Sequence, residues 1–191
     1  QDIGMANIIK KALPNAKLHA STQMTIHNLD GANKLYDLGF SRVVLSRELT
    51  KDEVSYIVKN SKIETEVFVH GALCVSYSGQ CLFSSFIGKR SANRGSCAQP
   101  CRLLYSINNK KGFYLSPYDL CLLDELKTLK EIGVSSLKIE GRMKSPEYVA
   151  LVTYIYKKYL NSNEDVKSED KDLLLGIFSR GKKFTKGHFA N

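Results

Sequence analysis

The sequence predicts an α/β protein in which short parallel strands alternate with helices. Three strand-like segments begin at residues 17, 41 and 64, about 24 residues apart, and a helix-like segment separates each pair. This rhythm is typical of βαβ units, because two parallel neighbours are joined by a crossover connection, usually a helix. Functional side chains in such folds gather at the carboxyl ends of the strands, so we expect a site at that edge of the sheet.

Local signals place the elements of the first half. Gly39 ends the first helix, in which Leu35 and Leu38 share one face. Thr50 and Glu53 form a Ser/Thr-x-x-Glu capping box that starts the second helix. The predicted strands cover residues 17–24, 41–49 and 64–73, and the predicted helices cover residues 28–39 and 50–61.

The second half interrupts this rhythm with a long segment rich in Gly, Ser, Arg and Cys. We expect residues 74–113 to form a functional loop that contains a short helix near 82–87. Ser145 and Pro146 are a cap and a first-turn proline, so they start the last predicted helix. The remaining predicted elements are a helix over 116–133, a strand over 134–143 and that last helix over 145–161.

Composition divides the chain into three parts. Residues 1–161 carry the pattern of strands and helices. Residues 162–172 are polar, and we expect them to form a mobile linker. Residues 173–191 form a basic and aromatic tail that begins a following segment.

The chain has 191 residues and a formal net charge of +9. Surplus Lys and Arg favour a polyanionic partner, and a merely solubilising surface is the alternative. Segment 179–189 interleaves basic side chains with Phe184 and Phe189. This pattern suits RNA through phosphate contacts and base stacking, although a solvated tail explains it equally well.

Targeting signals are absent from the sequence. The longest apolar runs fall far short of the roughly 20 residues of a membrane span, and no basic region followed by an apolar one opens the chain. We therefore expect a cytoplasmic protein without a membrane partner.

Four of the five cysteines lie close together in the sequence, at Cys74, Cys81, Cys97 and Cys101. Disulfides are rare in a reducing compartment, so metal or redox chemistry is the sharper interpretation. The spacing differs from the C-x2-C pairs of zinc ribbons, whereas iron–sulfur clusters tolerate varied spacings. Buried free thiols and one or two disulfides are the alternatives. Cys121, on an apolar helix face, is either a core residue or a substitute ligand for Cys101.

Polar side chains follow the predicted strands at their carboxyl ends. Arg47 lies at the carboxyl end of the second strand, and Glu140 and Arg142 lie at that of the last one. Anion recognition by Arg and acid–base work by Glu compete here with plain structural ion pairs. His19 and His70, which lie in or near strand ends, are each candidates for a general base, a metal ligand or a satisfied buried histidine.

Residues 66–84 carry the most specific motif of the chain. Its positions are Glu66, Phe68, Gly71, Ala72, Leu73, Cys74, Gly79, Cys81, Phe83 and Ser84. They resemble the pattern E-x-F-x2-G-[SA]-[LIVM]-C-x4-G-x-C-x-[LIVM]-S of the peptidase U32 family, the collagenase-like proteins. Only Phe83 departs from it, where an aliphatic residue is expected. Flanking segments such as SLKIEGRMKSPEYV also resemble the family, so the resemblance covers nearly the whole chain.

The resemblance implies a TIM-barrel-like catalytic domain, of which residues 1–161 form the later part with a Cys-rich loop insertion. Residues 1–6 would be the end of a mid-barrel strand. The chain lacks an initiator Met, so we expect a fragment or a processed chain. Four strands cannot close an eight-stranded barrel, so either a preceding segment completes it or a partner does so in a homo- or heterodimer.

The resemblance also implies chemistry, because members of the family include oxygen-independent hydroxylases that hold a [4Fe–4S] cluster through cysteines. Their implied activity is hydroxylation of a tRNA or rRNA base with prephenate as the hydroxyl source. The implied cluster ligands are Cys74, Cys81, Cys97 and Cys101. The implied catalytic residues are Arg47 and Arg142, which bind an anionic co-substrate or phosphate, and Glu140 or His70, which moves protons.

Two other functions stay open. Some family members are described as collagenases, so a peptidase acting on a peptide substrate is the first alternative. The sequence shows no nucleophile–base pair and no H-E-x-x-H zinc motif for it. A non-catalytic RNA-binding module is the second alternative, since it needs only the basic surface.

Overall fold

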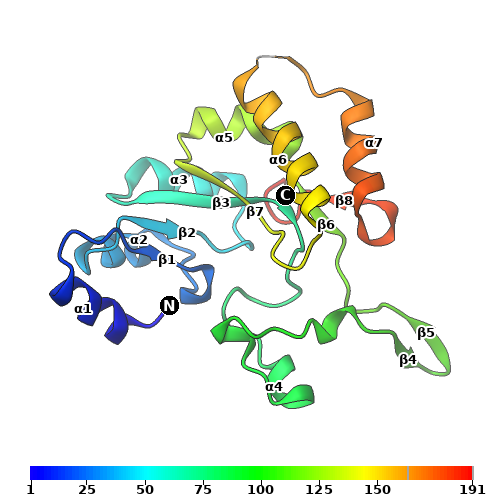
Figure 1. Cartoon of the computed structure of the whole chain (residues 1–191), viewed down its shortest axis with the longest axis horizontal. Helices are drawn as coiled ribbons and strands as arrows, with labels where there is room; N and C mark the ends of the chain where they lie inside the picture. The colour runs from blue at the N-terminus through cyan, green and yellow to red at the C-terminus, as the bar shows by residue number, and fades with distance from the viewer. Residues whose placement is uncertain (163, 191) are drawn as a thin grey trace.

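The computed structural model describes residues 1–162 and 164–190, and a six-stranded sheet lies at its centre (Figure 1). Strands β1, β2, β3 and β7 run parallel in that order, which confirms the predicted βαβ arrangement. Strand β6 joins the end of β3 in the antiparallel sense, and β8 pairs with β6 in parallel. The strands are β1 (His19–Ala20), β2 (Arg42–Val44), β3 (Glu64–Gly71), β6 (Asp119–Cys121), β7 (Ser136–Ile139) and β8 (Phe184–Thr185).

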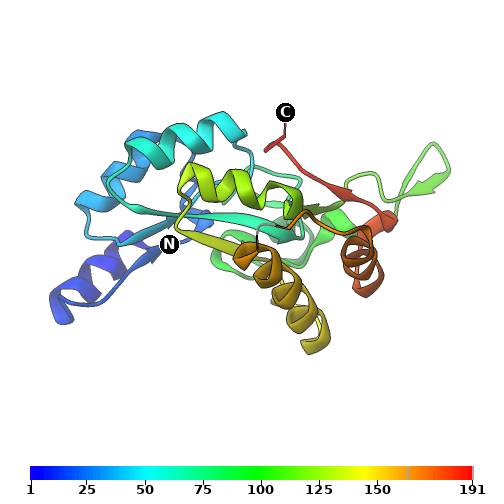
Figure 2. The same ribbon diagram turned by 90° about the horizontal axis from the view of Figure 1, so that it is seen from above.

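Helices α2, α3, α5, α6 and α7 pack each against the next in that order. Figure 2 shows α2, α3 and α5 lying along one face of the sheet. The helices are α1 (Ile3–Ala12), α2 (Leu29–Asp37), α3 (Lys51–Asn60), α4 (Phe83–Gly88), α5 (Leu126–Ile132), α6 (Pro146–Asn161) and α7 (Ser168–Ile177). Short 3-10 turns are η1 (Thr22–Met24), η2 (Ala92–Arg94), η3 (Pro100–Arg102), η4 (Leu123–Glu125) and η5 (Arg180–Lys182).

The sheet is open across the described residues, and its strands do not close into a barrel. The protein is therefore a mixed α/β structure built on parallel strands. Within residues 1–162 and 164–190, none of the helices combines the length and the apolar character that crossing a membrane requires.

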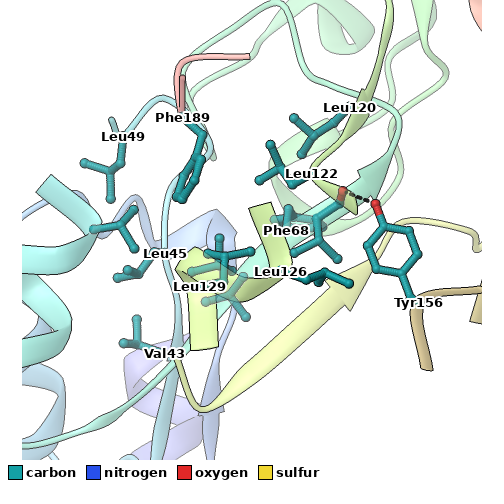
Figure 3. Close-up of a cluster of buried hydrophobic side chains, with 14 of the residues drawn as sticks. Val43, Leu45, Leu49, Phe68, Leu120, Leu122, Leu126, Leu129, Tyr156 and Phe189 are labelled. Carbon is teal, nitrogen blue, oxygen red and sulfur yellow. Dashed lines mark hydrogen bonds between the residues drawn. The ribbon is translucent and has the colours of Figure 1, made fainter. Parts of the chain in front are cut away.

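Apolar side chains from both halves of the chain form one core between the sheet and its helices. Figure 3 shows its centre, which includes Val43, Leu45, Leu49, Phe68, Leu120, Leu122, Leu126, Leu129, Tyr156 and Phe189. The Tyr156 hydroxyl donates a hydrogen bond to the Val69 carbonyl at 2.8 Å, which ties α6 to β3. Removal of this apolar surface from water, at roughly 25 cal/mol per Å², is the main force that holds the layers together.

The expectation that residues 1–6 end a strand is wrong, because they begin α1. The Asp2 carboxylate accepts a hydrogen bond from the Met5 amide at 2.9 Å and caps the helix. Apolar residues continue through Ile8 and Ile9 at a helical spacing, which the short segment at the terminus does not reveal on its own.

The expected helix over 116–133 is wrong in its first half. Strand β6 and turn η4 occupy that part, and α5 begins at Leu126. The Leu122 amide donates to the Val69 carbonyl at 2.8 Å, which extends the pairing of β6 with β3. Leu120, Leu122 and Leu123 are all buried, so this run is apolar because a strand and a turn are enclosed by the core.

The described residues of the expected linker and tail take part in the fold, whereas residues 163 and 191 of these segments lie outside the described residues. Helix α7 begins within the expected linker, and Asp170 on it pairs with Lys158 of α6 at 2.7 Å. Strand β8 joins the sheet, where Phe184 is half-buried, and Phe189 is only 5% exposed in the core. The two aromatic rings expected to stack on RNA are therefore packed inside the protein.

The segment between β3 and β6 contains the short helix expected near 82–87, which is α4. It also contains a hairpin that the sequence analysis missed, formed by β4 (Tyr105–Ile107) and β5 (Lys110–Gly112). Figure 1 shows α4 and this hairpin lying away from the sheet, beyond the end of β3. We call residues 72–118 the β3–β6 segment.

Gly71 closes β3 in a position that only glycine fits. Its φ is +103°, in the region that side chains strongly disfavour, and an added Cβ would collide with the Glu140 carbonyl oxygen. The Glu140 amide donates to the His70 carbonyl at 2.8 Å beside it. The ends of β3 and β7 can therefore meet only because residue 71 has no side chain.

We predict that Gly71→Ala destabilises the protein by roughly 3 kcal/mol, because strain and collision add at this site. Gly88→Ala is the matched control, since a Cβ there meets nothing within 4 Å, and it should change stability by less than about 1 kcal/mol. Urea unfolding of the two variants measures the difference. Equal unfolding free energies would show that the close approach at Gly71 is not a constraint.

Candidate functional site

A cavity of about 490 Å³ opens where the carboxyl ends of β2, β3 and β7 meet the β3–β6 segment. Arg47 follows β2, Cys74 follows β3, and Glu140 and Arg142 follow β7, and all four line the cavity. Residues from three strand ends therefore share one cavity. The β3–β6 segment supplies most of the opposite wall.

The four clustered cysteines all line this cavity, and all four are free thiols. Burial raises the pKa of Cys101, and the neighbouring thiols of Cys74, Cys97 and Cys81 raise it further, whereas Arg102 lowers it. These mutual effects follow from the proximity of the four sulfurs. The fold thus brings together thiols that are up to 27 positions apart in the printed sequence.

A backbone amide and a side-chain hydroxyl lie close to the Cys97 sulfur. The Gln99 amide donates to Cys97 Sγ at 3.3 Å, and the Ser84 hydroxyl lies 3.9 Å from it. The Ser84 hydroxyl also accepts from the Ala98 amide at 3.1 Å, which fixes its position. Donors around a sulfur stabilise negative charge on it, as they do around thiolate ligands of iron–sulfur clusters.

A single metal ion has no ready site in the described part of the chain. There, no three side chains among the histidines, cysteines, aspartates and glutamates are grouped closely enough to hold one ion. A cluster of several irons spreads its thiolate ligands more widely than one ion does, because each thiolate binds a different iron. The donor set of four free thiols on one cavity wall is of the type that such a cluster takes.

Positive charge dominates the remaining wall of the cavity. Its basic residues are Arg47, Arg102, Lys138, Arg142, Lys144 and Arg180, and Glu140 is its acidic residue. Lys138 pairs with Glu66 at 3.2 Å, and Arg180 forms an ion pair with the buried Asp119. Among the described residues Arg47, Arg142 and Lys144 have no ion-pair partner, so they are available to an anion.

Arg47 is held in place while part of its guanidinium stays unpaired. Its guanidinium carbon lies 4.8 Å from the centre of the Phe68 ring, and Nη1 donates to the Ala72 carbonyl at 3.4 Å. Its Nε is buried and has no hydrogen-bond partner within the described structure. A half-buried and positioned arginine that lines a cavity is suited to recognition of a carboxylate or phosphate.

Glu140 and Arg142 lie in the turn after β7. Arg142 Nη2 donates to the Gly95 carbonyl at 3.0 Å, which connects this turn to the β3–β6 segment. The Tyr148 hydroxyl lies 3.5 Å from the Glu140 carbonyl and supports the turn from α6. The Glu140 side chain forms no ion pair with another described residue, so its carboxylate is available at the cavity.

His70 lies outside the cavity wall and inside the core. It is 1% exposed, and its ring centre is 5.4 Å from that of Tyr156 and 5.3 Å from that of Phe184. Nδ1 lies 3.2 Å from the Tyr156 hydroxyl, which donates its proton to the Val69 carbonyl, so Nδ1 is the protonated nitrogen. Burial lowers the pKa of His70 to about 4, against a smaller opposing effect of Asp119. The imidazole is therefore neutral and structural near pH 7.

Three more basic residues, Lys144, Arg102 and Arg180, line the cavity, and Lys144 among them was missed by sequence reasoning. Lys144 follows Arg142 by two positions, and burial lowers its pKa to about 8, with Arg180 adding to the effect. Arg102 follows Cys101 directly and donates to the Ser116 hydroxyl at 3.0 Å and the Pro117 carbonyl at 2.9 Å. No local sequence pattern predicts that Arg180, which belongs to the carboxyl-terminal segment, lines this cavity.

Cys121 packs against the core and does not line the cavity with the other four cysteines. It lies on β6, its sulfur is 3.6 Å from the Tyr156 hydroxyl, and burial raises its pKa. It does not line the cavity, whereas Cys101 does.

Comparison with known proteins identifies related sequences. The family model described as Peptidase family U32 matches residues 1–191. The chain is 37% identical over 166 residues to tRNA hydroxylation protein P1 of Bacillus subtilis (strain 168). It is 42% identical over 170 residues to 23S rRNA 5-hydroxycytidine C2501 synthase of Escherichia coli (strain K12). It is 34% identical over 199 residues to a protein named collagenase from Porphyromonas gingivalis (strain ATCC BAA-308 / W83).

These alignments cover 80%, 85% and 91% of this chain, in the same order. They cover 39%, 25% and 47% of the relatives, so the chain spans less than half the length of each. No solved structure matches the chain.

The buried His70 predicts a specific dependence of stability on pH. Its pKa is about 4 when folded and about 6.5 when unfolded, so between these values the unfolded state binds more protons. The free energy of unfolding must then fall as pH falls, by about 3 kcal/mol across the window. His70→Phe should lose this contribution, and urea unfolding at steps from pH 7 to pH 4 measures it.

The exposed His188 offers the control for this prediction. The His188→Phe variant should keep the pH dependence of the unaltered protein. Parallel stability curves for the unaltered protein and His70→Phe would contradict a buried neutral imidazole.

Proposed function

The chain belongs to peptidase family U32, and we propose that it forms the catalytic site of an oxygen-independent hydroxylase that modifies a base of tRNA or rRNA. In this proposal a [4Fe–4S] cluster is the resident cofactor, prephenate is the hydroxyl source, and the reaction takes place in the cytoplasm. The observation that carries the proposal is the convergence of four free thiols and six basic side chains on one cavity.

The residues of the cavity fit a cluster of this kind. Cys74, Cys81, Cys97 and Cys101 would hold it, and when bound it would supply electron transfer. Four thiolates give such a site negative charge, which the basic wall of the cavity offsets. The Gln99 amide, which donates to Cys97 Sγ at 3.3 Å, provides a hydrogen bond to sulfur of the type that tunes such sites.

The unpaired cations suit an anionic co-substrate. Prephenate carries two carboxylates, and Arg47 and Arg142 are two of the three arginines of the wall without an ion-pair partner in the described residues. The third, Arg102, donates to the Ser116 hydroxyl and the Pro117 carbonyl instead. Arginine binds a carboxylate through two parallel hydrogen bonds, which fixes the position of the ligand as well as its charge. Arg47, which lines the cavity, would bind one carboxylate in this way.

Glu140 and Lys144 are the candidates for proton transfer in the same cavity. The lowered pKa of Lys144, about 8, lets its ammonium group give up a proton close to neutral pH. Glu140 offers a carboxylate without an ion-pair partner among the described residues, which suits it to accept one. His70, which the sequence analysis paired with Glu140, would instead keep the end of β3 in place from within the core.

RNA is the proposed substrate for two reasons. Two of the relatives are named for hydroxylation of tRNA or of a 23S rRNA cytidine. The net charge of +9 favours a polyanion. An enzyme that modifies a base must take it out of its stack and admit it to a pocket, and a cavity of about 490 Å³ with a basic wall has suitable room and charge.

Peptide-bond hydrolysis is the alternative, and the relative named collagenase favours it. A thiol peptidase needs a thiolate beside a histidine base. Among the described residues no histidine lines the cavity, and burial raises the pKa of Cys101. Both observations oppose an activated thiol. A non-catalytic RNA-binding module would have no use for four convergent thiols.

We predict that Cys97→Ala in the full-length protein lowers hydroxylation of RNA to below about a hundredth, because a cluster ligand is lost. RNA affinity should change by less than about twofold. Mass spectrometry of the nucleosides after anaerobic reaction with prephenate measures the first quantity, and fluorescence anisotropy measures the second.

Cys121→Ala is the matched control, since this thiol lies outside the cavity and belongs to the core. It should retain hydroxylation. Full activity in Cys97→Ala would remove the cluster from the account, and proteolysis of peptides that depends on Cys97 would favour the peptidase alternative.

A further inference from the structure

The positive charge of the protein is concentrated in the β3–β6 segment. Residues 72–118 contain six basic side chains and no aspartate or glutamate. The basic residues are Lys89, Arg90, Arg94, Arg102, Lys110 and Lys111. Arg102 lines the cavity, and the other five are exposed. The segment therefore presents a field of one sign beside the proposed active site.

The β4–β5 hairpin is the best-defined part of this basic surface. Asn108 and Asn109 form its two-residue turn with φ of 50° and 62°, the conformation that a type I′ hairpin turn requires. The Tyr114 hydroxyl donates to the Lys110 carbonyl at 2.9 Å and holds the returning chain against the hairpin. Figure 1 shows the hairpin projecting from the body of the molecule.

The base of the hairpin is packed against the cavity wall. The Tyr105 hydroxyl donates to the Pro100 carbonyl at 2.8 Å, and its ring stacks on Phe83 with 6.3 Å between centres. Phe83 and Pro100 both line the cavity. Three residues in each strand, at about 3.3 Å per residue, carry the turn roughly 10 Å beyond this base.

Two basic side chains and two aromatic ones lie close together in the sequence of the second strand of the hairpin and the chain that follows it. Lys110 and Lys111 are exposed, Phe113 is 62% exposed, and Tyr114 is 48% exposed. The carboxyl-terminal segment has a similar composition, but its Phe189 is buried in the core. The hairpin is thus a place where the basic–aromatic pattern remains accessible to a ligand.

We propose that the β4–β5 hairpin and residues 113–114 are a docking surface for the RNA strand that enters the cavity. This inference rests on the proposed function, and it assigns the contact that holds the substrate outside the reacting site. Lys110 and Lys111 contact phosphates, and Phe113 stacks on an unpaired base next to the one admitted to the cavity.

The chemistry of the surface favours RNA over an acidic protein. Charge alone suits either partner, but unpaired bases offer flat faces to an exposed aromatic ring, and this combination is the usual one for single-stranded nucleic acid. The base of the hairpin packs against the cavity wall through Tyr105 and Pro100, which matches a ligand that continues from the hairpin into the cavity.

Charge reversal tests the phosphate contacts. The double variant Lys110→Glu/Lys111→Glu should bind a fluorescein-labelled tRNA transcript about tenfold more weakly, and the slope of log affinity against log salt should fall by about 2. Lys59→Glu/Lys62→Glu makes the same change of charge on exposed residues near the start of β3, at the opposite end of that strand from the cavity. That control should lose less than about twofold. Phe113→Ala should weaken binding of a short single-stranded oligouridylate about tenfold.

The outcomes separate the docking surface from the proposed function. Selective loss in the hairpin variants, with thermal unfolding unchanged, supports the proposal. Equal losses in the hairpin and control variants overturn the docking surface and leave the proposed function standing. Absence of RNA binding by the unaltered full-length protein overturns both, as does charge-dependent binding to anionic lipid vesicles or to an acidic protein in place of RNA.

Discussion

The hydrogen bond from the Glu140 amide to the His70 carbonyl holds the cavity together. It joins the ends of β3 and β7 at 2.8 Å, and it forms because Gly71 leaves room for the Glu140 backbone. The thiols follow the end of β3, whereas Glu140 and Arg142 follow β7. This junction, together with the hydrogen bond from Arg142 to the Gly95 carbonyl, therefore places the thiols beside the proposed acid–base and anion-binding groups.

Core residues also stabilise the junction between the ends of β3 and β7. The His70 side chain lies among aromatic rings, and the Tyr156 hydroxyl serves both His70 Nδ1 and the Val69 carbonyl. A buried neutral imidazole costs less than a charged one, so the core keeps His70 uncharged and leaves proton transfer to the cavity. At the end of β3, His70 thus packs in the core, whereas the residues proposed for catalysis line the cavity.

Concentrated positive charge is the second constraint. Burial lowers the pKa of both Lys144 and Arg102, with Arg180 adding to the effect on Lys144. Burial and basic neighbours therefore disfavour the charged forms of Lys144 and Arg102 while no anion is bound. The repulsion among these basic side chains would be offset by any of the proposed anions: a thiolate cluster, a carboxylate co-substrate or an RNA phosphate. The basic wall is therefore better explained by its ligands than by stability of the protein alone.

Local sequence predicted the features that depend on near neighbours. The capping box at Thr50 forms, the parallel strands alternate with helices, and Arg47, Glu140 and Arg142 meet with the four cysteines. Features decided by distant contacts escaped prediction. The run around Leu120 resembles a helix until its pairing with β3 is known, and Phe184 resembles an RNA contact until β8 joins the sheet.

Iron and acid-labile sulfide analysis of the full-length protein, purified without oxygen, tests the central claim most directly. The account predicts about four irons and four sulfides per chain with a broad absorption band near roughly 400 nm, and loss of all three in Cys97→Ala but not in Cys121→Ala. Metal-free protein with four titratable thiols in the cavity, obtained under the same conditions, would contradict it.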